Sequence, residues 1–206
     1  MKQNIQLGVL SLSLLLTLLG CASLITPRVT SEVASLKAGE YKLDRAHATV
    51  LFKVSHLGLS TYVGRFNEFD ASLDFAPENI AATKLNGIID IDSLDINNVP
   101  LAKDLLGRSW FDQERFPQAV FTTREVREVN ANQFEFVGDL DWRGVVKPIA
   151  LLVTFNGGAN NILSGRYTLG FEAESTFLRS DFGMDAYIPA VGDEIKVEIY
   201  AEFQRS

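Results

Sequence analysis

The feature that most limits the fold of this chain is an alternation of apolar and polar residues, which recurs from Tyr41 almost to the C-terminus. A period of two is the signature of β-strands with one buried face. Glycine, asparagine, aspartate and proline separate the runs, and these residues favour turns. The alternating runs lie at 50–54, 69–75, 85–91, 119–123, 134–142, 149–155, 167–173 and 195–203.

The runs predict an all-β fold of about eight strands. One-sided alternation is typical of antiparallel sheets. Antiparallel strands that all bury one apolar face close most economically into an up-and-down barrel, because closure removes the exposed edges. A two-sheet sandwich has the same periodicity and stays open as an alternative. We predict a single barrel domain over residues 39–206.

One segment, between Asn98 and Gly107, departs from the period of two. Leu101 and Leu105 stand four residues apart, as do Ala102 and Leu106. This spacing places them on one face of a helix. Asn97 or Asn98 is suited to cap its start, and Gly107 to end it. We predict a short helical insertion here.

The N-terminus has the pattern of an export signal. Lys2 precedes an apolar run at 7–19, which is shorter than the roughly 20 residues that span a membrane. Leu18-Leu19-Gly20-Cys21 resembles the lipobox of bacterial lipoproteins. We expect residues 1–20 to be a signal peptide, Cys21 to be lipidated, and residues 21–38 to form a flexible tether. Ala22 rather than aspartate after the cysteine favours the outer membrane, with the domain facing the periplasm.

Composition excludes several classes of function. The formal charge is −7 and becomes −8 when Lys2 is removed with the signal. This acidic chain lacks the clustered basic residues that bind nucleic acid. Cys21 is the only cysteine, so lipidation leaves no thiol for a disulfide or a nucleophile. His47 and His56 are nine residues apart, which places them on opposite faces of a strand. We therefore predict no metal site and no cofactor.

The inward faces of the predicted strands are uniformly apolar. An eight-stranded barrel is just wide enough to be filled by side chains or to hold one small ligand. Gly87 and Gly138 fall on inward positions, where they either leave space or mark bends in the strands. A ligand in such an interior would be long and apolar. The residues expected to line the cavity are Val50, Phe52, Val54, Phe69, Leu73, Ile89, Ile91, Phe121, Phe136, Gly138, Leu140, Leu151, Val153 and Phe171.

An ordered series of motifs runs from about Gly39 to the C-terminus. They are Tyr41-Lys42-Leu43-Asp44, His47, residues 50–60, Gly64-Arg65-Phe66, Asp92-Ser93-Leu94, residues 108–112, residues 116–121, residues 138–145, residues 179–184 and residues 191–195. Together they resemble the YceI-like lipid-binding family. The resemblance implies a lipocalin-like antiparallel barrel with a helical insertion, usually exported, that encloses a polyisoprenoid or other amphipathic chain.

Several polar or bulky residues stand where the strands end. We expect them to contact a lipid headgroup or to shape the barrel mouth: His56, Arg108, Trp110, Arg179 and Asp181. For Arg179 and Asp181, a purely structural ion pair is the alternative.

The predicted function is noncatalytic binding and carriage of a polyisoprenoid, a quinone or another long amphipathic lipid, which is the bound ligand and main partner. Two alternatives stay open. One is an envelope stress or interaction module whose core is solid. The other is a lipid-modifying enzyme that uses His56.

Overall fold

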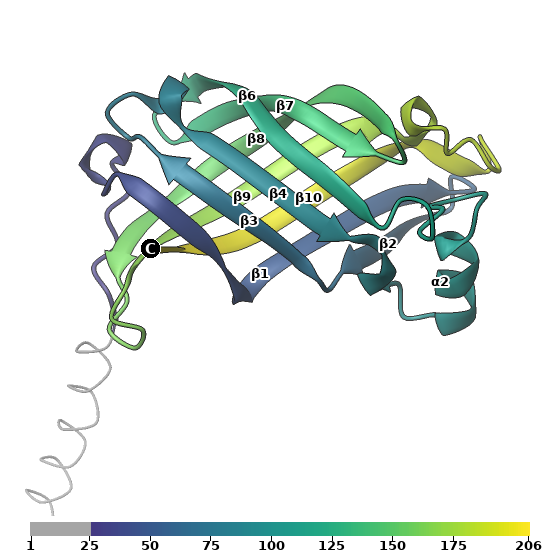
Figure 1. Cartoon of the computed structure of the whole chain (residues 1–206), viewed down its shortest axis with the longest axis horizontal. Helices are drawn as coiled ribbons and strands as arrows, with labels where there is room; N and C mark the ends of the chain where they lie inside the picture. The colour runs from purple at the N-terminus through teal and green to yellow at the C-terminus, as the bar shows by residue number, and fades with distance from the viewer. Residues whose placement is uncertain (1–25) are drawn as a thin grey trace, which may run out of the picture.

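The computed structural model describes residues 26–206, and these residues form a closed antiparallel β-barrel with one short α-helix (Figure 1). Eight strands make the closed wall in the order β1-β3-β4-β6-β7-β8-β9-β10, and β10 pairs back onto β1. The structure confirms the barrel and excludes the sandwich. The wall strands are β1 (Gly39–His56), β3 (Phe69–Phe75), β4 (Lys84–Asp90), β6 (Gln118–Asn130), β7 (Gln133–Trp142), β8 (Val145–Asn160), β9 (Tyr167–Leu178) and β10 (Val191–Arg205).

Shorter elements complete the domain. They are β2 (Ser60–Phe66), β5 (Leu94–Asp95), helix α2 (Val99–Leu106) and the 3-10 helices η1 (Val33–Ser35), η2 (Ile80–Ala82), η3 (Ile91–Ser93) and η4 (Arg179–Phe182). No helix within residues 26–206 is long and apolar enough to cross a membrane.

The long strand β1 divides the barrel into two halves. One edge of β1 pairs with β10, with a shift of register between Leu43 and Ala48. Its other edge changes partner: residues 39–42 pair with β3, whereas residues 50–56 pair with β2. In the second half, β5 adds to β2 and ends the sheet. Helix α2 lies beside this part of the barrel (Figure 1).

We call the two ends of the barrel the closed pole and the mouth. The closed pole holds the start of β1 and the turn from β8 to β9, and both chain ends described in the structure lie near it (Figure 1). The mouth holds the end of β1, the end of β9 and helix α2.

A solid aromatic core fills the half of the barrel next to the closed pole. Phe155 is at its centre, with ring centroids 5.2 Å from Phe75, 5.0 Å from Phe134 and 4.7 Å from Phe171. The buried members of this closed-pole cluster are Val33, Leu36, Tyr41, Leu73, Phe75, Phe121, Val126, Phe134, Phe136, Leu151, Val153, Phe155, Leu169, Phe171, Ala173, Ala201 and Phe203.

The segment before β1 packs against the closed pole. Thr30 pairs with Gly158 of β8, and Val33 and Leu36 are buried in the closed-pole cluster. The hydroxyl of Tyr41 donates a hydrogen bond of 2.6 Å to the carbonyl of Lys37. The tether expected over 21–38 is therefore docked from Thr30 onward. The expected signal peptide, residues 1–20, and Cys21 lie outside the described residues.

Helix α2 agrees with the prediction of a short insertion. The Oδ1 atom of Asn98 accepts a hydrogen bond from the backbone N–H of Leu101 at 3.2 Å, and Pro100 stands in the first turn, where its missing N–H costs nothing. Gly107 ends the helix, with its N–H bonded to the carbonyl of Asp104.

The two inward glycines have different surroundings. A Cβ atom built on Gly138 would clash with the carbonyl oxygen of Thr122 and would lie 2.6 Å from the ring of Phe121. A Cβ atom on Gly87 would meet only the carbonyl oxygen of Asp70, at 4.0 Å. Gly138 thus makes room for Phe121 and not for a ligand.

This difference predicts opposite effects of alanine on stability. Gly138→Ala should lower the free energy of unfolding by about 1–3 kcal/mol, because overpacking forces the strand or Phe121 to move. Gly87→Ala is the matched control, and it should change stability by less than about 1 kcal/mol. Urea unfolding of the two variants checks this. Equal stabilities of the two variants would contradict the packing described here.

Candidate functional site

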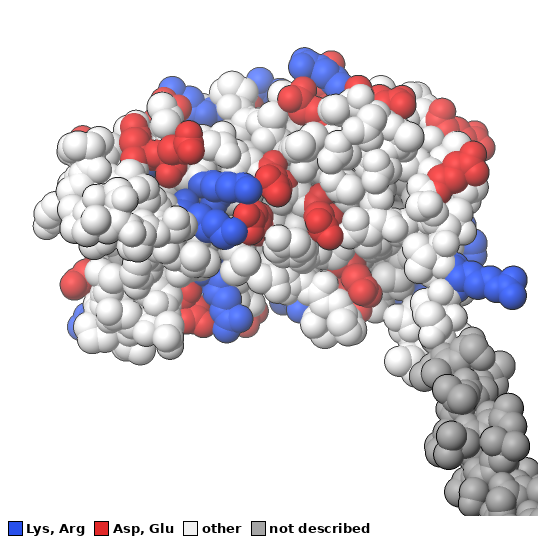
Figure 2. Space-filling view, turned by 180° about the vertical axis from the view of Figure 1, so that it is seen from behind, with Lys and Arg blue, Asp and Glu red and all other residues white. Residues whose placement is uncertain are grey.

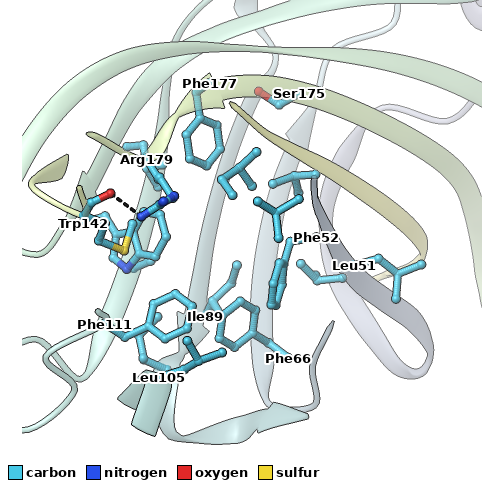
Figure 3. Close-up of a pocket in the computed structure, with 18 of the residues that line it drawn as sticks. Leu51, Phe52, Phe66, Ile89, Leu105, Phe111, Trp142, Ser175, Phe177 and Arg179 are labelled. Carbon is cyan, nitrogen blue, oxygen red and sulfur yellow. Dashed lines mark hydrogen bonds between the residues drawn. The ribbon is translucent and has the colours of Figure 1, made fainter. Parts of the chain in front are cut away.

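The half of the barrel next to the mouth contains a cavity of about 650 Å³ (Figure 3). This volume lies within the usual range for small-molecule sites. The strands contribute mainly alternate residues, as the pleat favours: Val50, Phe52, Val54 and His56 from β1, and Ile195, Val197 and Ile199 from β10. Leu51 of β1 and Val191 of β10 also line the cavity. Because the lining reaches exposed residues at His56 and Ser60, we place the opening of the cavity at this end of the barrel.

In the mouth half, the inward side chains leave part of the interior unfilled. Phe52, Ile149, Val197 and Ile199 point inward and line the cavity, but each is only partly buried. Their remaining exposed surface faces the empty space. In the closed-pole half, inward residues such as Phe136 and Phe155 are each only 1% exposed.

Helix α2 provides one side of the cavity wall. Leu101 and Leu105 line the cavity from this helix, and Phe111 joins them from the segment that follows. Phe111 packs on Trp142 with ring centroids 5.6 Å apart and on Phe66 at 6.0 Å. An amphipathic helix thus closes the part of the wall where β5 ends the sheet.

Arg179 is the most deeply buried charged residue of the cavity lining, with 2% of its surface exposed. Its guanidinium donates to four backbone carbonyls that belong to Met184, Ala186, Val191 and Gly192, at 2.6 to 3.0 Å. Burial lowers the pKa of Arg179, and the nearby carboxylates of Asp193 and Asp185 act in the opposite direction. These bonds fasten the loop from β9 to β10 beside the mouth.

Aromatic rings continue this arrangement to the surface. The guanidinium of Arg179 lies 5.2 Å from the ring centroid of Trp110, and Trp110 stacks on Tyr187 at 6.0 Å with 20° between the ring planes. Such cation–π contacts are favourable where the cation is desolvated.

A buried indole N–H also belongs to this wall. Within residues 26–206, Nε1 of Trp142 has no hydrogen-bond acceptor. The ring of Phe177 stands perpendicular to it, at 6.2 Å between centroids, and both residues line the cavity (Figure 3).

Eight of the fourteen residues expected to line a cavity do so in the structure. They are Val50, Phe52, Val54, Ile89, Ile91, Phe121, Leu140 and Leu151.

The other six do not line the cavity. Phe69 packs against a second buried cluster, which includes Phe66, Phe111 and Trp142, without lining the cavity, and Gly138 lies under the ring of Phe121. The remaining four belong to the solid closed-pole cluster: Leu73, Phe136, Val153 and Phe171. Periodicity gives the face on which a side chain lies, but it does not give its height along the barrel.

The five residues expected at the mouth divide in the same way. His56, Trp110 and Arg179 line the cavity. Arg108 does not line it and is exposed. Asp181 lies 3.7 Å from Lys147 and does not pair with Arg179, so the structural ion pair considered for Arg179 and Asp181 is wrong. Within the described chain, Arg179 is held by carbonyls and not by a carboxylate.

Sequence reasoning missed several lining residues. Ile195, Val197 and Ile199 of β10 line the cavity, and they show the same alternation as the strands whose residues are predicted to line it. Tyr62, Phe66 and Phe111 carry no such signal, because their positions depend on the hairpin of β1 and β2 and on the segment after α2.

Another polar cluster lies outside the cavity. The Nδ1 atom of His47 and Oδ2 of Asp44 are 3.0 Å apart, and Glu202 is close to both. The bond to His47 lowers the pKa of Asp44, and Asp44 in turn raises the pKa of His47. Asp44 also accepts bonds from Ala46 and Gln204, so the structure gives it a full set of local partners.

The geometry defines a class of protein: a closed β-barrel with an apolar internal cavity that opens at one end. Residues 41–203 match the YceI-like domain family, and the chain belongs to that family. A UPF0312 protein of Yersinia enterocolitica is 36% identical over 174 residues, which cover 84% of this chain and 90% of that protein.

Solved structures share the fold. The YCEI protein of Campylobacter jejuni aligns with a TM-score of 0.66 and 25% identity, covering 88% of this chain and 99% of that one. A domain from Saccharophagus degradans that is described as polyisoprenoid-binding aligns with a TM-score of 0.59 and 14% identity. It covers 82% of this chain and all of that domain, and at this identity it shows the fold alone.

The carbonyl contacts of Arg179 predict that lysine cannot replace it. Lysine lacks the planar fork that reaches several carbonyls at once, so Arg179→Lys should lower the free energy of unfolding by about 2–4 kcal/mol. Hydrogen exchange should increase in residues 184–192. Arg127→Lys, on the exposed outer wall, is the control and should change stability by less than about 0.5 kcal/mol. Similar stabilities of the two variants would contradict the role given to Arg179.

Proposed function

We propose that this protein binds one long apolar or amphipathic lipid, such as a polyisoprenoid or a quinone, in the cavity without chemically changing it. The observation that carries the proposal is the cavity itself, whose lining is almost entirely aliphatic and aromatic. The relationship to the YceI-like family and the polyisoprenoid-binding description of one structural neighbour support the same ligand class.

Burial of hydrocarbon supplies enough free energy for such binding. Each buried methylene contributes about 0.8 kcal/mol, so a stretch of about ten gives roughly 8 kcal/mol before the cost of ordering the ligand. Affinity of this kind selects for chain length and width rather than for a particular polar group.

The position of the polar lining residues suggests the orientation of the ligand. His56, Ser60 and Trp110 lie at the mouth, whereas the deeper wall is apolar apart from Ser175 and Arg179, which are bonded to backbone carbonyls. We infer that the hydrocarbon tail enters first and that the headgroup stays near His56 and Trp110.

A binding role fits the state of these polar groups better than an enzymatic one. The guanidinium of Arg179 is engaged with four carbonyls, and the hydroxyl of Ser175 donates to the carbonyl of Ala150. His56 faces Ser60 across the β1–β2 pair. Lipid recovered unchanged in mass after long incubation with the protein supports this role, and a modified product would favour the enzyme alternative.

The second part of the proposal concerns location. The Leu-Leu-Gly-Cys pattern at 18–21 supports export and acylation of Cys21, with the barrel attached to the outer membrane and facing the periplasm. Stable anchoring requires more than one acyl chain, which a lipoprotein cysteine provides.

Blocking the cavity should prevent lipid binding. Val197→Trp places a large ring in the cavity and should reduce the amount of co-purified lipid at least tenfold in native mass spectrometry. Tyr200→Trp is the control, because Tyr200 lies on the same strand but is 44% exposed on the outside. Thermal unfolding of both variants checks that each one folds. Equal lipid content in the two variants, or no lipid in the native protein, would refute cavity binding.

Removing the acylation site should detach the protein. Cys21→Ser, expressed behind a signal peptide that is cleaved without lipidation, should move the protein from the membrane fraction to the soluble fraction after export. The thermal stability of the barrel should stay the same, because Cys21 precedes the docked segment that begins at Thr30. Continued membrane association of the exported Cys21→Ser protein would contradict the proposed anchor.

A further inference from the structure

Two neighbouring loops beside the mouth carry exposed apolar side chains. Leu57 and Leu59, in the turn from β1 to β2, are 56% and 84% exposed, and Tyr187 and Ile188, in the loop before β10, are 72% and 37% exposed. We call these four residues the apolar rim. Figure 2, which shows the molecule from behind with the mouth at the left, has few charged side chains at this end.

The two loops of the rim form one connected surface. The backbone N–H of Leu57 donates to the carbonyl of Ala190 at 2.7 Å, and the N–H of Val191 donates to the carbonyl of Tyr187 at 2.9 Å. Leu57 and Tyr187 also have positive φ angles, 55° and 61°. This conformation is unfavourable for residues with a Cβ atom. Unusual backbone geometry that holds apolar side chains in solvent suggests a functional role for the surface.

The rim is continuous with the cavity. His56 lines the cavity and directly precedes Leu57, Val191 lines it and closes the second loop, and Trp110 lines it while stacking on Tyr187. A lipid that enters or leaves must pass these residues. Contact between the rim and a bilayer would let the hydrocarbon tail pass without exposure to water.

The N-terminal attachment lies at the other end of the barrel. Thr30 pairs with Gly158, and the Nζ atom of Lys37 donates to Asn160 at 3.2 Å, both at the closed pole. Five steps of β1 from Leu43 to Ala48 match only two steps of β10, so three of the seventeen steps between Gly39 and His56 add no length. The remaining fourteen span about 46 Å at 3.3 Å per residue. At a usual barrel tilt of about 40° the mouth therefore lies about 35 Å farther along the axis.

The chain between Cys21 and the docked segment is too short to bridge that distance. However it is arranged, the stretch from Cys21 to Thr30 cannot exceed about 32 Å. An acylated Cys21 would therefore hold the closed pole near its own membrane and would prevent the mouth from facing that membrane end-on.

We propose that the apolar rim docks on a lipid bilayer other than the one that holds Cys21, so that the cavity exchanges its lipid with an opposing membrane. This inference rests on the proposed function, because it requires both the lipid-binding cavity and the anchor.

A vesicle assay with the full-length lipidated protein tests the geometry. The protein is reconstituted into vesicles of phosphatidylethanolamine and phosphatidylglycerol, and ubiquinone-10 is added either to these vesicles or to separate ones. Quenching of the two tryptophans, Trp110 and Trp142, reports loading, because both line the cavity. Loading from the separate vesicles should be at least tenfold faster than loading from the vesicles that carry the anchor.

Lengthening the tether is the decisive variant. An insertion of about forty Gly and Ser residues after Ser23 gives the tether a typical span of about 40 Å and a much longer maximum reach. Loading from the anchor's own vesicles should then rise at least tenfold, while loading from separate vesicles should stay within about twofold. Equal loading from both kinds of vesicle with the native tether would overturn the proposal.

A matched pair of substitutions tests the rim. Leu59→Asp should slow loading from separate vesicles at least fivefold. Leu163→Asp is the control, because Leu163 is 91% exposed in the turn from β8 to β9, at the closed pole. Equal rates for the two variants would refute docking through the rim.

A further assay, in which the quinone is supplied in detergent, distinguishes a failure of bilayer docking from a failure of lipid binding in the cavity. Loading from detergent without loading from any vesicle would overturn bilayer docking and would favour delivery by another protein. Absence of loading even from detergent would refute the proposed cavity function itself.

Discussion

The pairing of β1 determines where the barrel is solid and where it is hollow. Along one edge this strand pairs with β10, which closes the barrel. Along the other edge it pairs first with β3 and then with β2. Where β3 is the partner, the wall is a regular barrel and its interior is packed with aromatic rings. Where β2 is the partner, the sheet ends at β5, and helix α2 stands in for a further strand.

The hollow half depends on helix α2, which occupies the position where a further strand would otherwise continue the sheet. Leu101 and Leu105 reach the cavity from α2, and Phe111 fixes the following segment against Trp142. Val197 and Ile199 of β10 also line the cavity, and both residues are only partly buried. A packed core and an open cavity can therefore coexist in one domain, because each half has its own wall.

The amino-acid sequence predicts much of this fold for a clear physical reason. Alternation identifies the buried face of each strand, so residues such as Val50 and Phe52 were placed inside the barrel from the pattern alone. The ends of α2 followed from Asn98 and Gly107, whose side chain and backbone suit capping.

Other features depend on tertiary pairing, which alternation does not contain. Phe136 and Leu140 lie on the same face of β7, but the first is packed in the closed-pole core and the second lines the cavity. Gly138, between them, makes room for the ring of Phe121, a contact between two strands. Likewise, Asp181 is near Arg179 in sequence, yet Arg179 binds carbonyls of the following loop and Asp181 lies beside Lys147. The docking of Thr30 on Gly158 joins residues that are far apart in the chain.

The packed half of the barrel also has a consequence for traffic through the molecule. Val33 and Leu36 add to a core in which Phe75, Phe136 and Phe155 are each 1% exposed. The cavity is thus blind-ended, and a guest cannot thread from one end of the protein to the other. A ligand would have to enter and leave the cavity through the same opening, so a bound ligand would have to dissociate before the next one could bind. The shape of the cavity is therefore compatible with holding one ligand at a time and not with passing a ligand through the barrel.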